Sequence, residues 1–379
     1  MQLTQIDLQP RGGTEERTRR FAEICNACRY CEGFCAVFPA IELRRHFTSG
    51  DLNYLANLCH DCRGCYYSCQ YAPPHEFGLN LPKAFAELRF ETYERYAWPR
   101  AFAASFRRNG LISVALAFAC TILFFVVAIS GHTNVIHSAG AFYAAIPEAT
   151  MIIITGAAFS FALLALSVSL INFWRDTHDD TAVDASSFLA ALGDILTLRN
   201  LGGGGHGCNS KDEGFSQARR YFHHCLFYGF LFCFGSTSSA AFYEHVLGRI
   251  PPFPLTSIPV LLGTIGGIGM LIGIAGLVQI KAAADAAPMS KLMRDIDYCF
   301  LALLFVATAT GLLLLALRGT SAMSTLLAVH LGVIVALFLM LPYCKFVHGL
   351  YRAAALVRSA AERRKKGLET AEVDNAVED

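Results

Sequence analysis

Eight cysteines near the start of the chain fall into two sets with identical spacing. Both sets have the pattern C-x2-C-x2-C-x3-C, first in CNACRYCEGFC (25–35) and again in CHDCRGCYYSC (59–69). A proline follows each set at the same offset, as Pro39 and Pro73. Cysteine thiolates act as nucleophiles, as metal ligands or as disulfide partners, so the duplicated set should serve one of these chemistries.

The spacing within each set indicates iron–sulfur chemistry. A zinc site takes two separated cysteine pairs, which would leave the middle cysteine of each triplet without a role. A C-x2-C-x2-C loop can reach three corners of a [4Fe–4S] cluster, and in two-cluster ferredoxins the fourth cysteine binds the other cluster. The sequence therefore predicts two [4Fe–4S] clusters with crossed ligation. Cluster one would be bound by Cys25, Cys28, Cys31 and Cys69, and cluster two by Cys59, Cys62, Cys65 and Cys35. The proline comes four residues after the last cysteine instead of directly after it, so the local turn departs from the bacterial ferredoxin pattern.

Histidines form the second group of potential metal ligands. His330 and His348 would lie on one face of a single helix, about 27 Å apart along its axis at 3.6 residues per turn. Another apolar segment carries His223 and His224 near one end and His245 near the other. Two helices with histidines at two depths are typical of b-type haem proteins, in which each iron is held by two imidazoles. One or two haems are therefore expected, with His223 or His224 opposite His348, and His245 opposite His330. The alternative for His245 is an interfacial histidine with no ligand role.

The amino-acid composition indicates a membrane protein. Of 379 residues, 54% are hydrophobic and 16% are charged, whereas apolar residues usually make up about 45–50% of a soluble domain. Apolar runs of about 20 residues can span a bilayer as helices. Six are present, at 111–130, 150–174, 221–246, 255–280, 298–317 and 322–346. We predict a mostly α-helical protein: a ferredoxin-type domain with two [4Fe–4S] clusters (1–100), a six-helix transmembrane bundle (101–350) and a basic, then acidic tail (351–379).

Charge distribution predicts the orientation. Lys and Arg concentrate in the connections on the side of the N-terminal domain, whereas the opposite connections carry almost none, so both termini should be cytoplasmic. The N-terminus has no apolar run of the kind found in signal peptides. Thiols stay reduced in the cytosol, which disfavours disulfides. The formal net charge of +1 and the lack of a basic stripe give no support to nucleic-acid binding.

Several other features have structural interpretations. The glycines of GTIGGIGMLIGIAG (263–276) favour close helix packing, because a dinucleotide fingerprint would have to follow a strand. The loop GGGGHGC (202–208) is either a flexible turn or a docking or quinone-gating loop, with His206 and Cys208 as its reactive groups. Residues 187–199 have helical amphipathic spacing and could lie along the membrane surface. His132 and His137 are expected in a solvated outer loop. The remaining cysteines, expected to act as small hydrophobic residues, are Cys120, Cys225, Cys233, Cys299 and Cys344.

Long stretches of the chain resemble a known family. The two cysteine sets, the glycine-rich loop, RRYFHHCLFYGFLFCFGSTSSAAFYEHVLG (219–248) and LLAVHLGVIVALFLMLPYCKFVHGLYR (326–352) are similar to the tricarballylate/citrate utilisation protein B family (TcuB/CitB). The membrane part is more distantly similar to the γ subunit of respiratory nitrate reductase, in which histidines spaced like His330 and His348 bind two b haems. The histidines of the partner segment are spaced differently. The resemblance implies a bacterial cytoplasmic (inner) membrane protein that passes electrons from the reduced flavin of a soluble FAD-dependent tricarballylate dehydrogenase to membrane quinone.

Three classes of function compete for this sequence. An electron-transferring, quinone-reducing oxidoreductase that is not itself the substrate dehydrogenase accounts for the two cysteine sets and the histidine-bearing spans. A self-contained ferredoxin-type enzyme would need paired carboxylates, a nucleophile or a nucleotide fingerprint, and the sequence shows none of these. The alternative, a redox-sensing or transport-associated membrane iron–sulfur protein, lacks the buried Arg or Lys that a carrier of polyanions needs. We therefore expect the first class.

Overall fold

The computed structural model describes residues 13–131, 142–179, 181–203 and 206–378. Within these ranges every regular element is helical, and the only β interaction is an isolated bridge between Cys208 and Ser216. The prediction of a mostly α-helical protein is confirmed. The predicted outer-loop residues His132 and His137 lie outside the described ranges.

Short helices build the N-terminal domain, called here the head. They are α1 (Thr14–Cys28), α2 (Val37–Glu42), α3 (Ser49–Leu58), α4 (Gly64–Tyr67) and α5 (Leu81–Tyr96). Helix α3 begins with a capping box, in which the Thr48 hydroxyl accepts from the Asp51 amide and the Asp51 carboxylate accepts from the Thr48 amide. Helix α5 begins at Asn80, whose side chain accepts from the Lys83 amide. These caps fix the two helices that pack together as the centre of the head core.

Six helices are long and apolar enough to cross a bilayer. They are α6 (Asn109–Gly131), α8 (Glu148–Thr177), α10 (Ala218–His245), α11 (Ile258–Ala282), α12 (Lys291–Leu317) and α13 (Met323–Met340), the last continued by a 3-10 turn (η3, Leu341–Tyr343). Each contains or closely overlaps one predicted span. Large apolar side chains such as Leu111 and Ile153 are mostly exposed on their outer faces, as expected for contact with lipid. The arrangement is compatible with a multi-pass membrane protein.

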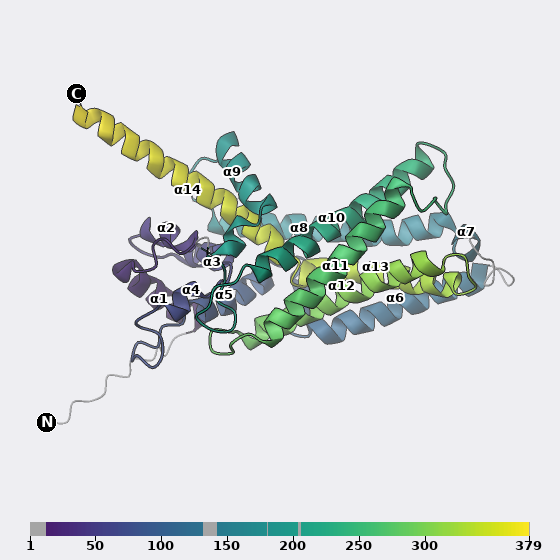
Figure 1. The fold of residues 1–379 in the computed structure, drawn as a ribbon, viewed down its shortest axis with the longest axis horizontal. Helices are drawn as coiled ribbons and strands as arrows, with labels where there is room; N and C mark the ends of the chain where they lie inside the picture. Colours follow the sequence, from purple (N-terminus) through teal and green to yellow (C-terminus); the bar gives the residue numbers. More distant parts are fainter. Residues whose placement is uncertain (1–12, 132–141, 180, 204–205, 379) are drawn as a thin grey trace.

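The head lies at one end of the long helices, and α14 (Val347–Glu378) extends from the same end (Figure 1). Short elements connect the long helices: η1 (Arg100–Phe106), α7 (Phe142–Ala145), α9 (Ala185–Leu196) and η2 (Arg199–Gly202). Helix α9 falls in the segment predicted to lie along the membrane surface. It packs against the last helix, and Phe188 and Leu189 remain exposed on it, so contact with lipid stays a prediction.

Glycines bring α10 and α11 into close contact. A Cβ atom at Gly273 would lie 2.6 Å from the amide nitrogen of Leu226, and one at Gly266 would lie 2.8 Å from the carbonyl oxygen of Gly229. Both distances are too short for any side chain, so the two backbones can approach this closely only because these positions are glycine. The prediction of close helix packing for residues 263–276 is confirmed.

The prediction that His330 and His348 share one helix is wrong. Helix α13 ends at Met340, and a new helix, α14 (Val347–Glu378), begins after η3 and an extended Cys344. Pro342 lies in the turn, and proline can neither donate its backbone hydrogen bond nor fit inside a helix without a clash at the preceding turn. The two histidines therefore belong to different helices, and their common helical face and 27 Å separation do not apply.

The C-terminal segment 351–379 is not a separate tail over its first turns. It continues α14, where Tyr351, Leu356 and Ala360 are buried against α3, α8 and α9. Figure 1 shows the later turns of this helix extending away from the rest of the protein. The predicted tail begins at residue 351, whereas the helix that contains it, α14, begins at Val347.

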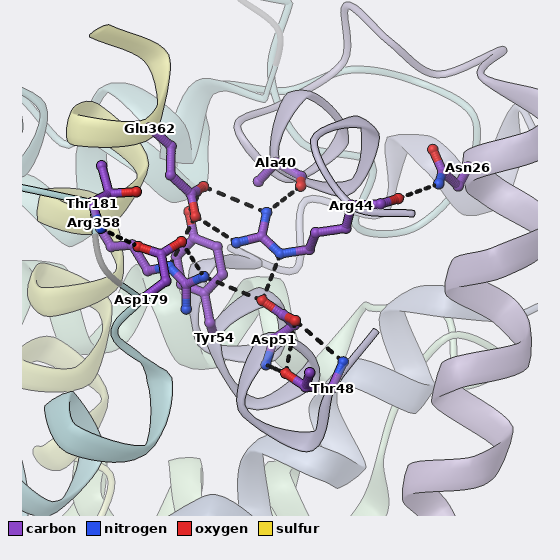
Figure 2. Close-up of polar contacts among 10 residues, drawn as sticks. All are labelled: Asn26, Ala40, Arg44, Thr48, Asp51, Tyr54, Asp179, Thr181, Arg358 and Glu362. Atoms are coloured by element: carbon purple, nitrogen blue, oxygen red, sulfur yellow. Dashed lines mark hydrogen bonds and ion pairs between the residues drawn. The ribbon is translucent and has the colours of Figure 1, made fainter. Parts of the chain in front are cut away.

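A buried ionic network joins the head to α14 (Figure 2). Arg44 donates to Asp51 at 2.8 Å and to Glu362 of α14 at 2.5 Å. Arg358, also on α14, donates to the same two carboxylates, and the Tyr54 hydroxyl donates to Glu362. The ring of Tyr54 lies under both guanidinium groups. Each buried charge therefore has partners from the other part of the molecule, which fixes the head on the bundle.

Candidate metal centres

Cys25, Cys28, Cys31 and Cys69 line one pocket in the head. Three of them come from the first sequence set, and Cys69 comes from the second. This grouping is the one predicted for cluster one.

The other four cysteines, Cys35, Cys59, Cys62 and Cys65, line a second pocket next to the first. Cys65 borders both pockets. The two groups are called set one and set two below. The structure thus brings the thiols together in the crossed arrangement, although the loops that carry them are far apart in the sequence.

Left-handed turns let the chain curve around the two pockets. Arg29, directly after Cys28, has φ 55°, and its amide donates to the Cys25 carbonyl at 2.9 Å. Asp61 and Arg63, on either side of Cys62, have φ 55° and 66°. Non-glycine residues seldom adopt this conformation, and its recurrence next to cysteines in both loops is a feature of functional sites.

The thiols surround spaces larger than a single ion. Thiolates on one zinc ion, with bonds of about 2.3 Å, would lie roughly 4 Å apart. In the described part of the chain, no three cysteine sulfurs lie within 4.8 Å of one another. Burial and the neighbouring thiols raise the pKa of Cys31 to about 12, and the same causes raise the pKa of Cys25. A bound cationic metal centre would remove this mutual repulsion by taking the thiolates as ligands. The wide spacing of the sulfurs fits an iron–sulfur cluster better than a single zinc ion.

Set two is held by arginines, two of which come from helices outside the head, α10 and α14. Arg89 of α5 and Arg352 of α14 both donate to the carbonyl oxygen of Cys59, at 2.6 and 2.9 Å. Arg219, at the start of α10, donates to the carbonyl of Asp61 at 2.6 Å. The loop of set two is therefore bound directly to α10 and α14.

The glycine-rich loop also packs against set two. The Asn209 amide donates to the Cys62 carbonyl at 2.8 Å, and the Cys208 thiol donates to the Leu201 carbonyl at 3.0 Å. A Cβ atom at Gly203 would lie 2.4 Å from the carbonyl oxygen of Gly207. The described residues 201–203 and 206–209 are thus hydrogen-bonded or closely packed at their positions, and the flexible-turn interpretation stays untested. His206 is exposed and contacts the Phe215 ring. A docking or gating role for this loop stays untested.

One predicted histidine pair is brought together. The ring centres of His223 and His348 lie 6.2 Å apart, and two imidazoles on opposite sides of one metal ion, with bonds of about 2 Å, would have ring centres roughly 6 Å apart. His348 Nδ1 contacts the Lys345 carbonyl, which can only accept, so Nδ1 carries the proton and Nε2 keeps its lone pair. His224 instead stacks on Tyr228 of its own helix. The geometry favours His223 over His224 as the partner of His348.

The second predicted histidine pair, His245 with His330, is not brought together. His330 Nδ1 lies 3.0 Å from the Thr310 hydroxyl of α12, and its ring packs on Gly311. The His245 side chain is 50% exposed and lies 3.9 Å from a carboxylate oxygen of Glu148 on α8. The difference arises because α10 packs along α11, whereas His330 points toward α12. Within the described structure, a second haem has no pair of facing imidazoles.

The first imidazole pair lies close to set two through shared helices. Arg219 precedes His223 by about one turn of α10, and Arg352 follows His348 by about one turn of α14. Side chains one turn apart lie on the same helix face. Sequence analysis did not identify Arg89, Arg219 or Arg352 as functional residues. Arg219 and Arg352 each lie four residues from a predicted ligand, whereas no pattern in the sequence connects Arg89 with one.

Comparisons with known proteins agree with the two-part organisation. Residues 18–95 match the family model described as the Citrate utilization protein B Fer4-like domain, and residues 105–369 match Citrate utilization protein B. The chain is 45% identical over 355 residues to an Escherichia coli protein named Citrate utilization protein B, covering 93% of each chain. No solved structure matches the protein.

Proposed function

Because this chain belongs to the citrate utilization protein B family, with a Fer4-like head and six apolar helices that indicate an iron–sulfur electron-transfer role, we propose that it conducts electrons from a soluble flavoprotein to membrane quinone. The family resemblance implies that the donor is a soluble FAD-dependent tricarballylate dehydrogenase, and the name of the relative refers to citrate utilization. In this proposal the protein is an oxidoreductase but does not bind the flavin or act on the carboxylate.

The contact between the two parts of the molecule carries the proposal. The loop of set two is hydrogen-bonded to Arg219 and Arg352, on the two helices whose histidines face each other. A flavin hydroquinone releases two electrons and a quinone takes up two, whereas iron–sulfur clusters and haems accept one each, so a route through them carries the two electrons one at a time. The candidate ligands lie in segments that contact one another. Cys65 borders both cysteine pockets, and the loop of set two is bonded to the helices that carry His223 and His348.

The candidate ligands would bind two kinds of cofactor. The thiolates would bind two [4Fe–4S] clusters, which supply the one-electron chemistry. His348 and His223 would bind a b-type haem from either side, with the Lys345 carbonyl holding the His348 ring in the correct tautomer. Quinone would bind among the apolar helices. The proposed location is the bacterial inner membrane with the head and both termini on the cytoplasmic side, where a soluble donor can reach the head.

Reconstitution tests the proposal. The protein in vesicles, mixed anaerobically with the reduced flavoprotein and a soluble quinone analogue, should reoxidise the flavin. The Cys28→Ser and Cys62→Ser variants should each be slower, because each removes a thiolate from one set. Cys120→Ser is the matched control, since Cys120 is buried in α6 within the membrane helices.

Iron and acid-labile sulfide should be present beyond haem iron and should fall in the two head variants but not in the control. Equal flavin reoxidation by empty vesicles would reject the electron-transfer proposal and favour a redox sensor. Stoichiometric zinc without labile sulfide would reject the iron–sulfur assignment.

A further inference from the structure

Positive charge is concentrated at set two. Arg89, Arg219 and Arg352 donate to the carbonyls of Cys59 and Asp61, two residues apart in its loop, at 2.6 to 2.9 Å. Arg89 is almost fully buried, with a second bond from Nε to the Ala56 carbonyl at 2.7 Å. Three guanidinium groups from α5, α10 and α14 thus surround one short segment, called here the arginine clamp.

The clamp arginines have no direct ion-pair partner. None of the three is in an ion pair of the described structure, and Asp61, the only acidic residue in the loop of set two, lies 3.7 Å from Arg63. The Nε of Arg352 is buried and has no hydrogen-bond acceptor. Buried charges of one sign are costly unless an opposite charge lies close to them. The carboxylates of Asp61 and Asp297 act on Arg219 at longer range, and the thiolates of set two would bring further negative charge close to the clamp.

Set one lies in a different electrostatic environment. Its sulfurs have neutral polar contacts: the Gln70 amide lies 3.8 Å from the Cys28 sulfur, and the backbone amides of Tyr71 and Ala72 donate to Cys69. Arg29, next to Cys28 in the sequence, is exposed, and its guanidinium donates to the Asn26 carbonyl. Tyr30, which lines this pocket, is 68% exposed. Charges near set one are therefore screened by solvent, whereas the clamp acts through the protein interior, where the effective dielectric constant is lower.

We infer that Arg89, Arg219 and Arg352 raise the reduction potential of the cluster at set two above that of the cluster at set one, so that electrons enter at set one and leave through set two. An iron–sulfur cluster becomes more negative when it accepts an electron, and nearby positive charge stabilises this reduced form. One electron passes from the reduced cluster at set one to the oxidised cluster at set two, without bond formation or proton transfer. This inference rests on the proposed function, whose donor is a reduced flavin.

The order fits the rest of the architecture. Set one borders solvent, where a soluble donor can approach. Set two contacts the helices that carry His223 and His348. The clamp arginines are positioning residues in this scheme, because they bind backbone carbonyls beside the thiols and act on the cluster through charge.

Redox titration of the full-length, iron-loaded protein, followed by electron paramagnetic resonance, tests the inference. It needs neither the flavoprotein nor quinone. In the Arg352→Gln variant the midpoint potential of one cluster should fall, while that of the other stays unchanged. Arg352→Lys, which keeps the charge, should recover most of the shift. Arg29→Gln, which removes an exposed charge beside set one, is the matched control and should leave both potentials unchanged.

These variants distinguish an effect of the arginine charge on the potential from a loss of structure. If both clusters keep their potentials in Arg352→Gln, or if the lysine variant behaves like the glutamine variant, the inference is overturned. If Arg352→Gln loses iron, Arg219→Gln tests the same clamp from α10 and should lower the same potential. Flavin reoxidation and the redox titration are separate measurements. The electron-transfer proposal can therefore hold when the inference about the arginine clamp is wrong, and the inference can hold when the electron-transfer proposal is wrong.

Discussion

At the scale of single residues, hydrogen bonds distinguish histidines that the sequence treats alike. His223 and His224 are neighbours, but only His223 faces His348. The Lys345 carbonyl orients His348, as carbonyls commonly do for metal-bound imidazoles. His330 and His245 are instead engaged with Thr310 and Glu148. In the proposed haem site, the choice between His223 and His224 therefore rests on which imidazole faces His348 and not on its depth in the membrane.

Substitution of the facing pair tests this assignment. His348→Ala and His223→Ala should each remove the α band of a reduced b-type haem, because each deletes one of two axial imidazoles. His224→Ala is the matched control and should keep the band, since His224 stacks on Tyr228. Absorption spectra of the reduced purified variants provide the measurement. Loss of the band in His224→Ala with retention in His223→Ala would reverse the assignment.

At the scale of elements, backbone contact between α10 and α11 limits which residues these helices can carry. The amide of Leu226 and the carbonyl of Phe222 lie within 2.7 Å of the position that a Cβ atom would take at Gly273. Helix α10 also carries Arg219 and His223, so its placement on α11 sets where those side chains lie. The glycines thus contribute to the site through packing.

Gly273→Ala should destabilise the bundle. Overpacking a close contact of this kind costs about 1–3 kcal/mol, because one backbone must move away from the other. Gly156→Ala on α8 is the control, since its Cβ atom would meet no atom within 4 Å. Thermal unfolding of the detergent-solubilised protein should show a lower Tm for Gly273→Ala alone. Equal Tm values for both variants would show that the two helices separate without cost.

At the scale of the whole molecule, α14 links the head to the bundle through charge. Arg44 and Arg358, one from each part, share Asp51 and Glu362. Burial alone would raise the pKa of Asp51, but hydrogen bonds from Arg44 and Thr48 outweigh it and the pKa is lowered. A lowered pKa means that the stabilisation is present above the usual aspartate pKa and is lost as the pH falls through the folded value.

Head docking should therefore weaken in acid and on neutralising the network. Glu362→Gln removes a buried charge shared by two arginines, and breaking such a pair costs about 3–5 kcal/mol. Limited proteolysis between the head and α6 should be faster for this variant at neutral pH, and faster for the native protein below about pH 4 than at pH 7. Glu16→Gln, at a carboxylate that is 68% exposed, is the control and should match the native protein. Identical cleavage of all three would show that the network does not fix the head.

Local patterns were sufficient to predict the elements and the cysteine groups. Hydropathy over about 20 residues depends only on neighbouring residues, so the six long helices followed from the sequence. The repeated cysteine spacing predicted which thiols lie together: Cys69 lines the pocket of set one and Cys35 that of set two, while their binding of clusters stays a proposal.

What only the tertiary structure decided depends on segments far apart in the chain. The break at Pro342 separates His330 from His348, and α10 presents His223, not His224, to α14. The arginine clamp joins residues 89, 219 and 352, which no sequence period connects. Apolar periodicity determines which segments become helices, but the faces that meet depend on the packing of all six long helices and the head.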